Sequence, residues 1–167
     1  MAGSVVGLYR KPLEGRSRGI PKRPVPELTI VPDGVEGDFN RWRTEKAASD
    51  PAQAILLLEV EILEALCIEG WPVRPGDLGE NVGIAGLPRG ALGPGTSVEL
   101  GGAVLEVSKA CDPCIVLYGL PYVGADRGPA FVRTMKGRRG WFARVVRPAL
   151  IRPGDPVAVT AHRPVLG

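Results

Sequence analysis

Short apolar runs separated by turn residues make up most of the chain. Such runs, rich in Val, Ile and Leu and bounded by Gly, Pro and Asp, are typical of β-strands. Gly101 and Gly102 lie between two of the runs and predict a tight hairpin. Turns are also expected at 32–34 and 152–155. The runs that predict strands are 5–9, 28–31, 54–58, 82–85, 98–100, 103–107, 141–146 and 157–160.

Two segments show a helical pattern instead. After Glu59 the apolar positions fall on one face of a helix, and Gly70 is expected to end it. Pro129 suits the first turn of a second short helix that reaches residue 135 or 136. Cys67 is expected only to pack, as a member of the apolar face formed by Ile62, Leu63, Leu66 and Cys67.

The mixture of many short strands, frequent turns and few helices indicates the fold class. It favours a mainly β chain, built as a barrel or a sandwich with a few short helices, over alternating βαβ units. The sequence shows no internal repeat and no domain boundary. We therefore expect residues 1–167 to form one domain.

Composition and charge narrow the classes of function. Aromatic residues make up 5% of the chain and the net charge is +3, so neither a base-stacking platform nor a strong polyanion surface is expected. No run of about 18 apolar residues is present to cross a bilayer, and the start of the chain does not resemble a signal peptide. We expect a cytoplasmic protein that binds neither nucleic acid nor membrane, with mostly reduced thiols.

The stretch Lys-Ala-Cys-Asp-Pro-Cys at 109–114 holds two of the three cysteines. Cys111 and Cys114 lie close to Lys109, and a nearby cation favours a reactive thiolate. This spacing permits a redox dithiol, half of a zinc site, or one ligand thiolate with a neighbour. Packed thiols without a role are a further alternative.

Two of these chemistries have weaker support from the rest of the chain. A structural zinc site needs four ligands, and only Cys67 and His162 remain to complete one. Redox motifs of this spacing occur in a βαβ context, which is absent. Asp112 would also raise the pKa of a neighbouring thiol.

Three other polar stretches carry candidate site residues. Asp38, in a glycine-rich stretch, is a candidate to orient a partner or accept a proton, unless it only caps a turn. Glu80 and Asn81 begin a predicted strand and would orient a polar ligand or close a turn. The basic segment 136–147 suits an oxyanion, or forms a solvated edge strand. Its candidate ligands are Lys136 and, expected on one face of a strand, Arg138 and Arg144.

The order of these motifs is more specific than any one of them. Along the chain come Gly-Val-Glu-Gly-Asp (34–38), Gln-Ala-Ile-Leu-Leu-Leu (53–58), Gly-Asp-Leu-Gly-Glu-Asn-Val (76–82), Leu-Gly-Pro-Gly (92–95), Val-Leu-Glu-Val (104–107), Pro-Cys-Ile-Val-Leu (113–117) and Gly-Trp-Phe-Ala-Arg-Val (140–145). This series resembles the MOSC family, a domain found at the C-terminus of molybdenum cofactor sulfurases and as small stand-alone bacterial proteins. The resemblance covers about residues 5–159.

The resemblance implies a barrel-like β fold with Cys114, in the Pro-Cys motif, as the functional thiol. In relatives that bind molybdenum cofactor this cysteine ligates the metal, and some relatives reduce N-hydroxylated bases and amines. A molybdenum-dependent reductase of small N-oxygenated substrates, supplied with electrons by a separate reductase, is therefore the first hypothesis. The candidate contacts to the pterin cofactor and its phosphate are Glu80, Asn81, Lys136, Arg138 and Arg144.

Other functions remain open at this point. Cys114 would carry a persulfide received from a cysteine desulfurase, or pass cofactor to a partner, in a protein without turnover of its own. Cys111 is not general to the family and would be an accessory or resolving thiol. A binding barrel with inert thiols is the third alternative. The family often shows Gly-Asp-x-His where this chain has Asn40, so a role that needs an imidazole there is not expected.

Overall fold

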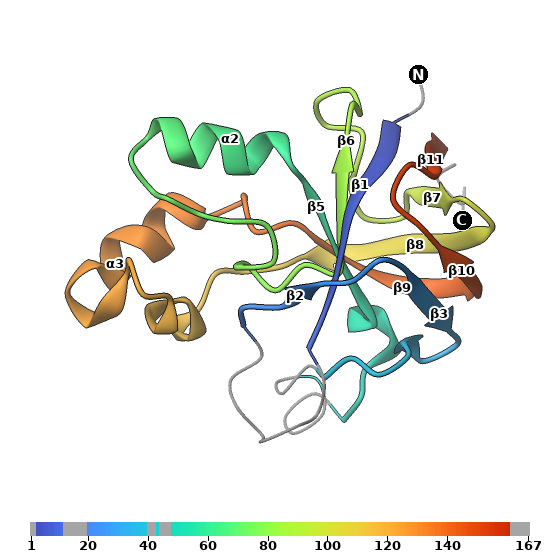
Figure 1. Ribbon diagram of the computed structural model, residues 1–167, viewed down its shortest axis with the longest axis horizontal. Coiled ribbons are helices and arrows are strands. Elements are labelled where there is room, and N and C mark those ends of the chain that lie inside the picture. Colours follow the sequence, from blue (N-terminus) through green and yellow to red (C-terminus); the bar gives the residue numbers. More distant parts are fainter. Residues whose placement is uncertain (1–2, 12–19, 40–42, 44–47, 161–167) are drawn as a thin grey trace, which may run out of the picture.

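The computed structural model describes residues 3–11, 20–39, 43 and 48–160 (Figure 1). Its helices are α2 (Glu61–Ile68) and α3 (Gly124–Met135), with 3-10 helices η2 (Pro51–Gln53) and η3 (Ile115–Gly119). Its strands are β1 (Gly3–Arg10), β2 (Arg23–Pro24), β3 (Leu28–Val31), β4 (Gly34–Val35), β5 (Ile55–Glu59), β6 (Val82–Ala85), β7 (Ser97–Leu100), β8 (Ala103–Ala110), β9 (Trp141–Arg147), β10 (Ala149–Ile151) and β11 (Pro156–Thr160).

Seven of these strands close into a barrel. Their order is β11-β7-β8-β9-β5-β6-β1, and β1 pairs back onto β11 through Gly3 and Val157. All neighbours are antiparallel except β5 and β6, which are parallel and are joined by a crossover that contains α2. Strand β2 pairs with the end of β1, and β10, β3 and β4 form a separate small sheet.

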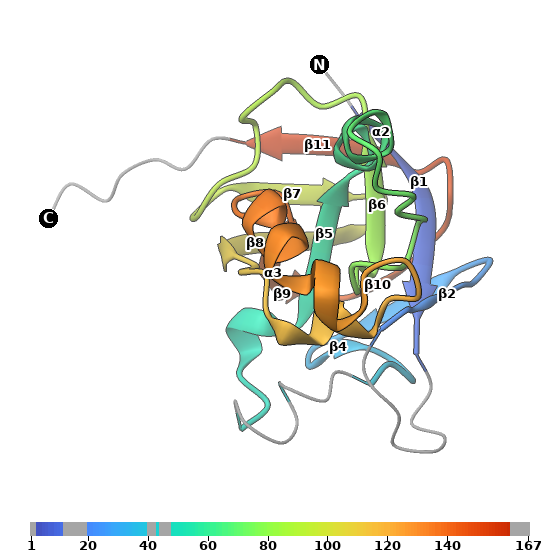
Figure 2. The same cartoon turned by 90° about the vertical axis from the view of Figure 1, so that its left-hand side faces the viewer.

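Apolar side chains fill the barrel because its strands alternate inward and outward positions. On β8, for example, Ala103, Leu105 and Val107 are buried and the residues between them are half-buried. A second apolar cluster joins Leu58 of β5 to Leu66 of α2 and to the helix α3. Figure 2 shows α2 and α3 on the same side of the barrel. The segments that lead into and out of these helices carry the thiols and the Gly-Glu-Asn motif.

The predicted mainly β fold is confirmed, and several of its strands were placed closely. Strands β3 and β6 have the predicted bounds, and the hairpin between β7 and β8 turns at Gly101, whose φ is +56°. The short strands β2, β4 and β10 were not predicted, because two or three residues are too few to show an alternation. None of the helices in the described part of the chain is long and apolar enough to cross a membrane.

Two predictions about the helices are wrong. Helix α3 begins at Gly124, one turn earlier than expected, so Pro129 lies inside it; its buried face is formed by Gly128, Phe131 and Met135. Helix α2 buries Leu63 and Leu66 but leaves Cys67 exposed. The apolar face of α2 is thus narrower than the sequence suggests, and the Cys67 side chain does not belong to the core.

Candidate functional site

The two cysteines of the Cys-Asp-Pro-Cys motif differ in their access to solvent. Cys111 follows β8, and its amide donates to the carbonyl of Gly140 at 2.9 Å, so the chain is still held against the segment before β9. Its thiol is buried, and burial raises its pKa. Cys114 is exposed and caps the start of η3, where its carbonyl accepts from the amide of Leu117 at 3.1 Å. Cys114 is therefore the accessible thiol of the pair.

The cation beside Cys114 is Arg139. Its Nη1 donates to Cys114 Sγ at 3.6 Å and to the Asp112 carbonyl at 3.1 Å. Its Nε donates to the Leu78 carbonyl at 3.3 Å, so one side chain joins the thiol segment to the Gly-Glu-Asn segment. Lys109 is exposed on β8, and no contact joins it to either thiol in the described part of the chain. A cation near the thiol was predicted, but from the wrong residue.

A glycine holds Arg139 in this position. Gly140 has a φ of +91°, and a Cβ on it would collide with the carbonyl oxygen of Leu57 on β5. Only glycine allows this close approach without strain. The chain therefore comes in close to β5 just after Arg139, and that side chain lies in the interior with 8% of its surface exposed.

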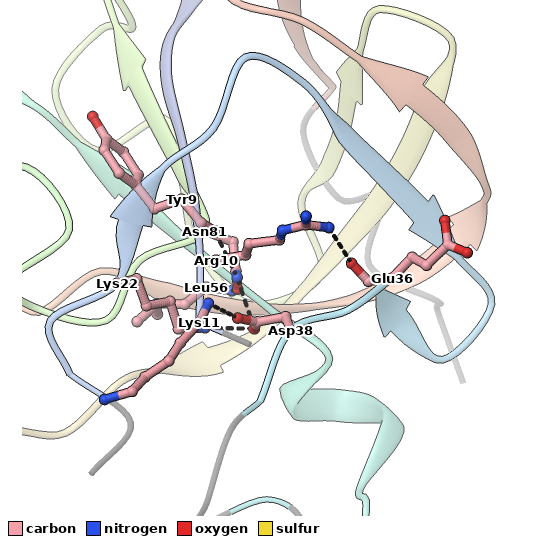
Figure 3. A network of polar contacts seen from close by, with 8 residues as sticks. All are labelled: Tyr9, Arg10, Lys11, Lys22, Glu36, Asp38, Leu56 and Asn81. Carbon is pink, nitrogen blue, oxygen red and sulfur yellow. Dashed lines mark hydrogen bonds and ion pairs between the residues drawn. The ribbon is translucent and has the colours of Figure 1, made fainter. Parts of the chain in front are cut away.

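Asp38, Lys22 and Asn81 form a second polar group, drawn in Figure 3. Asp38 Oδ2 accepts from Lys22 Nζ at 2.6 Å and from Asn81 Nδ2 at 2.9 Å, and Oδ1 accepts from the amide of Lys11 at 2.7 Å. The ion-paired side chains are only 4% and 7% exposed. Asp38 is thus a buried acceptor with three partners.

The side-chain amide of Asn81 has no N–H left for a ligand. Its Oδ1 accepts from the amide of Leu56 at 3.1 Å, and its Nδ2 donates to the carbonyl of Tyr9 at 3.2 Å as well as to Asp38. An amide nitrogen carries two hydrogens, so both are used. Asn81 joins β1, β5 and the Asp38 segment at one point.

Glu80 is buried next to this network, with 1% of its surface exposed. Its Oε1 accepts from the amide of Gly76, whereas its Oε2 has no hydrogen-bond partner among the described residues. Burial raises the pKa of Glu80 to about 7, and the Gly76 hydrogen bond opposes that shift. Gly76 in turn lies against the backbone of Lys22, whose amide donates to the Gly76 carbonyl at 2.9 Å.

The structure does not bring the predicted phosphate ligands together. Arg138 forms two hydrogen bonds, of 2.7 and 2.9 Å, with the carboxylate of Glu69 after α2. Arg144 lies within β9 and pairs with Glu106 of β8 at 3.5 Å. Lys136 is exposed at the end of α3. The expectation that Arg138 and Arg144 share one face of a strand is wrong, because β9 begins only at Trp141.

A family model described as the MOSC domain matches residues 44–158. The chain belongs to the MOSC family. The matched part contains the motif cysteines Cys111 and Cys114 as well as Arg139, Glu80 and Asn81. No curated protein sequence matches the chain. The resemblance seen in the sequence is thereby confirmed at the level of the family.

Solved structures of similar fold support the barrel. The YuaD protein from Bacillus subtilis shares 23% identity with a TM-score of 0.78, and the alignment covers 98% of each chain. YiiM from Escherichia coli shares 22% identity with a TM-score of 0.68, over 98% of this chain and 71% of that one. YiiM from Geobacillus stearothermophilus shares 24% identity with a TM-score of 0.67, over 95% and 75% of the two chains. At these identities the likeness establishes the fold.

Two buried cations of this MOSC domain, Arg139 and Lys22, were not among the predicted site residues. Arg139 lies in the basic segment that was singled out, but Gly137 and Gly140 flank Arg138 as well, so the sequence does not say which of the two arginines is buried. Lys22 is one of six basic residues in the segment 10–24, with nothing in the sequence to distinguish it. Asn40 and His162 lie outside the described residues.

The donor set of the MOSC site is sparse. No cluster of three or more His, Cys, Asp or Glu side chains that could hold a metal ion occurs among the residues that the structure describes. The accessible soft ligand is Cys114 Sγ, with the guanidinium of Arg139 against it.

Proposed function

We propose that this MOSC protein binds molybdenum cofactor through Cys114 and reduces a small N-oxygenated substrate with electrons from a separate reductase. The observation that carries the proposal is the exposed sulfur of Cys114 with the guanidinium of Arg139 at 3.6 Å. A cysteine ligates a metal as its thiolate, and an exposed sulfur is within reach of one. Membership of the MOSC family supports the choice of metal.

The residues present fit such a cofactor in part. Cys114 would hold the metal, and Arg139 would face its anionic groups. Of the three predicted phosphate ligands, Arg138 and Arg144 are engaged by carboxylates, so Lys136 is the one that stays available. When bound, the cofactor would supply the two-electron chemistry, in which an N–OH group takes up two electrons and two protons and is converted to an N–H group and water.

The chain's own residues hold and orient this site. Arg139 links Cys114 to the Leu78 carbonyl, and Glu80 clamps the same turn through the Gly76 amide. The Asp38 and Asn81 network ties that turn to β1 and β5. These contacts fix the position of the thiol relative to the barrel, which is what a site needs to orient a bound cofactor.

Metal analysis of protein from a cofactor-competent host tests the proposal. We expect molybdenum in the wild-type protein, near-background molybdenum in Cys114→Ala, and wild-type content in Cys67→Ser, which removes the other exposed thiol. Purified wild-type protein is then given an N-hydroxylated base and a chemical reductant. Equal molybdenum in the wild type and in Cys114→Ala would overturn the proposal.

A second function is favoured by the presence of two thiols with different burial. An exposed Cys114 would accept a sulfur atom from a cysteine desulfurase, and the buried Cys111 would stay protected. Intact-mass spectrometry after treatment with a desulfurase and cysteine tests this function. One added sulfur on the wild type and none on Cys114→Ala would support a carrier. Unmodified protein in both samples would argue against it.

A further inference from the structure

We propose that Arg139 makes the surroundings of Cys114 a binding site for small anions, so that this thiol favours anionic reactants over neutral ones of the same shape. The inference rests on the proposed role of Cys114 as the functional thiol, and it specifies the charge of the reactants that this thiol favours. It is carried by the hydrogen bonds of one buried arginine.

The guanidinium of Arg139 has donors to spare. An arginine side chain carries five N–H donors in a fixed planar fork. Nε and Nη1 contact the Leu78 carbonyl, the Asp112 carbonyl and Cys114 Sγ. Nη2 has no hydrogen-bond partner among the described residues, although only 8% of the surface of Arg139 is exposed. Two N–H groups next to the thiol are therefore free to bind a ligand.

Gly79 passes close to Nη2. This residue has a φ of +87°, and a Cβ built on it would stand 3.8 Å from Nη2 and 3.0 Å from a methyl group of Ile20. A side chain at position 79 would therefore crowd both Ile20 and the guanidinium.

No carboxylate neutralises Arg139 within the described residues, whereas the adjacent Arg138 is held by both oxygens of Glu69. A buried charge without a counterion is costly, and an anion bound from solution would offset that cost. Lys22, which also acts on the neighbouring Cys111, is neutralised by Asp38, and Asp112 adds a negative charge to the thiol segment. The attraction for an anion therefore comes from Arg139.

The geometry predicts what an anion gains at this site. An anionic group that reaches Cys114 Sγ comes next to Nη2, because the two terminal nitrogens of a guanidinium lie side by side. It receives a charge-assisted hydrogen bond, which a neutral analogue accepts only weakly. The preference therefore depends on the charge of the reactant rather than on the state of the thiol.

Paired alkylation with iodoacetate and iodoacetamide tests this inference. Both reagents attack the same Cys114 thiolate, so the ratio of their rates cancels the fraction of thiolate and reports the effect of charge. The protein carries Cys67→Ser, and labelling of Cys114 is followed by peptide mass spectrometry. We expect Arg139→Met to lower the iodoacetate-to-iodoacetamide ratio at least about tenfold, as for one lost hydrogen bond to a charged group.

Matched controls separate this effect from general changes. Arg138→Met removes the same charge one residue away and should leave the ratio unchanged. Arg139→Lys keeps the charge and should restore part of the preference. If Arg139→Met does not fold, sulfate at constant ionic strength is added to the Cys67→Ser protein and should slow iodoacetate more than iodoacetamide. An unchanged ratio in Arg139→Met, or no selective slowing by sulfate, would overturn the inference.

The two proposals fail separately. Molybdenum bound at Cys114 together with no charge preference would leave the proposed function standing and remove the anion site. A clear charge preference in a protein that acquires no molybdenum would keep the anion site and remove the cofactor.

Discussion

Two neighbouring polar regions of this MOSC domain differ in how completely their hydrogen bonds are satisfied. The side-chain amide of Asn81 uses both of its hydrogens and its oxygen, and Asp38 has three partners. Around Cys114 the guanidinium of Arg139 keeps unused donors, and the sulfur itself is exposed. The Asn81 amide has no N–H left to offer a ligand, whereas the region around Cys114 has both an accessible sulfur and free donors.

The comparison separates support from chemistry. A buried hydrogen-bonded network fixes the relative position of the strands that supply it, so removing one of its members should change the stability of the fold. A buried cation with free donors beside an accessible sulfur should instead affect ligand binding and the reactivity of the sulfur. Glu80 belongs to neither class fully, because one of its oxygens is bonded and the other is not.

The largest effect is expected for Asp38→Ala. This change leaves Lys22 buried without its counterion and one N–H of Asn81 without its acceptor, so we expect a loss of about 3–5 kcal/mol in the free energy of unfolding. Urea unfolding followed by tryptophan fluorescence measures it. The double variant Lys22→Met with Asp38→Leu should lose less than Asp38→Ala alone. A fully stable Asp38→Ala with impaired turnover would instead make Asp38 a catalytic group.

Glu80 should make stability fall as the pH rises. Burial raises its pKa from 4.5 to about 7, so between these values the unfolded chain has already lost the proton that the folded protein keeps. The free energy of unfolding should decrease across this window, by about 3 kcal/mol in total, and level off above pH 7. Glu80→Gln is neutral throughout, so the difference between variant and wild type should grow from pH 5 to pH 8. A constant difference would contradict the raised pKa.

The sequence identified the positions of the motifs better than the roles of their residues. Asn81 was found because Gly-Glu-Asn is a recognisable string, but its partners Tyr9, Leu56 and Asp38 come from three separate segments. Only the folded chain shows that they use up its amide. The roles of residues in a motif depend on such long-range contacts, which local pattern does not encode.

The basic segment shows the same limit more sharply. Arg138 and Arg139 are adjacent and identical in kind, and strand alternation alone favoured the first as a ligand. The structure pairs Arg138 with Glu69 on the surface and buries Arg139 against Cys114. What decides between them is the close approach of Gly140 to β5, a contact between residues more than eighty positions apart. The mainly β fold, in contrast, follows from many local alternations. These left a barrel and a sandwich open, and the family resemblance implied the barrel that the structure shows.

A smaller effect is expected for Tyr122, which ties the η3–α3 region to the turn that carries Glu80. Its hydroxyl donates to Asp77 Oδ2 at 2.9 Å, and burial, then this hydrogen bond, raises the pKa of Tyr122. The donor therefore stays protonated at neutral pH. Tyr122→Phe should lower the free energy of unfolding by about 1 kcal/mol. Tyr118→Phe is the control, since its hydroxyl has no hydrogen bond among the described residues and should change little.

The smallest effect should come from the ion pair of Arg144 and Glu106, which lies on the barrel outside both polar regions. The side chains are 49% and 47% exposed and 3.5 Å apart, so water screens the attraction and their ordering opposes it. Arg144→Ala should change the free energy of unfolding by about 0.5 kcal/mol or less, against several for Asp38→Ala. Both variants remove one partner of an acid–base pair, but only Asp38 is buried and accepts two further hydrogen bonds, so the contrast measures what the buried network adds. Similar losses in the two would mean that charge pairing itself, and not burial, makes the Asp38 region rigid.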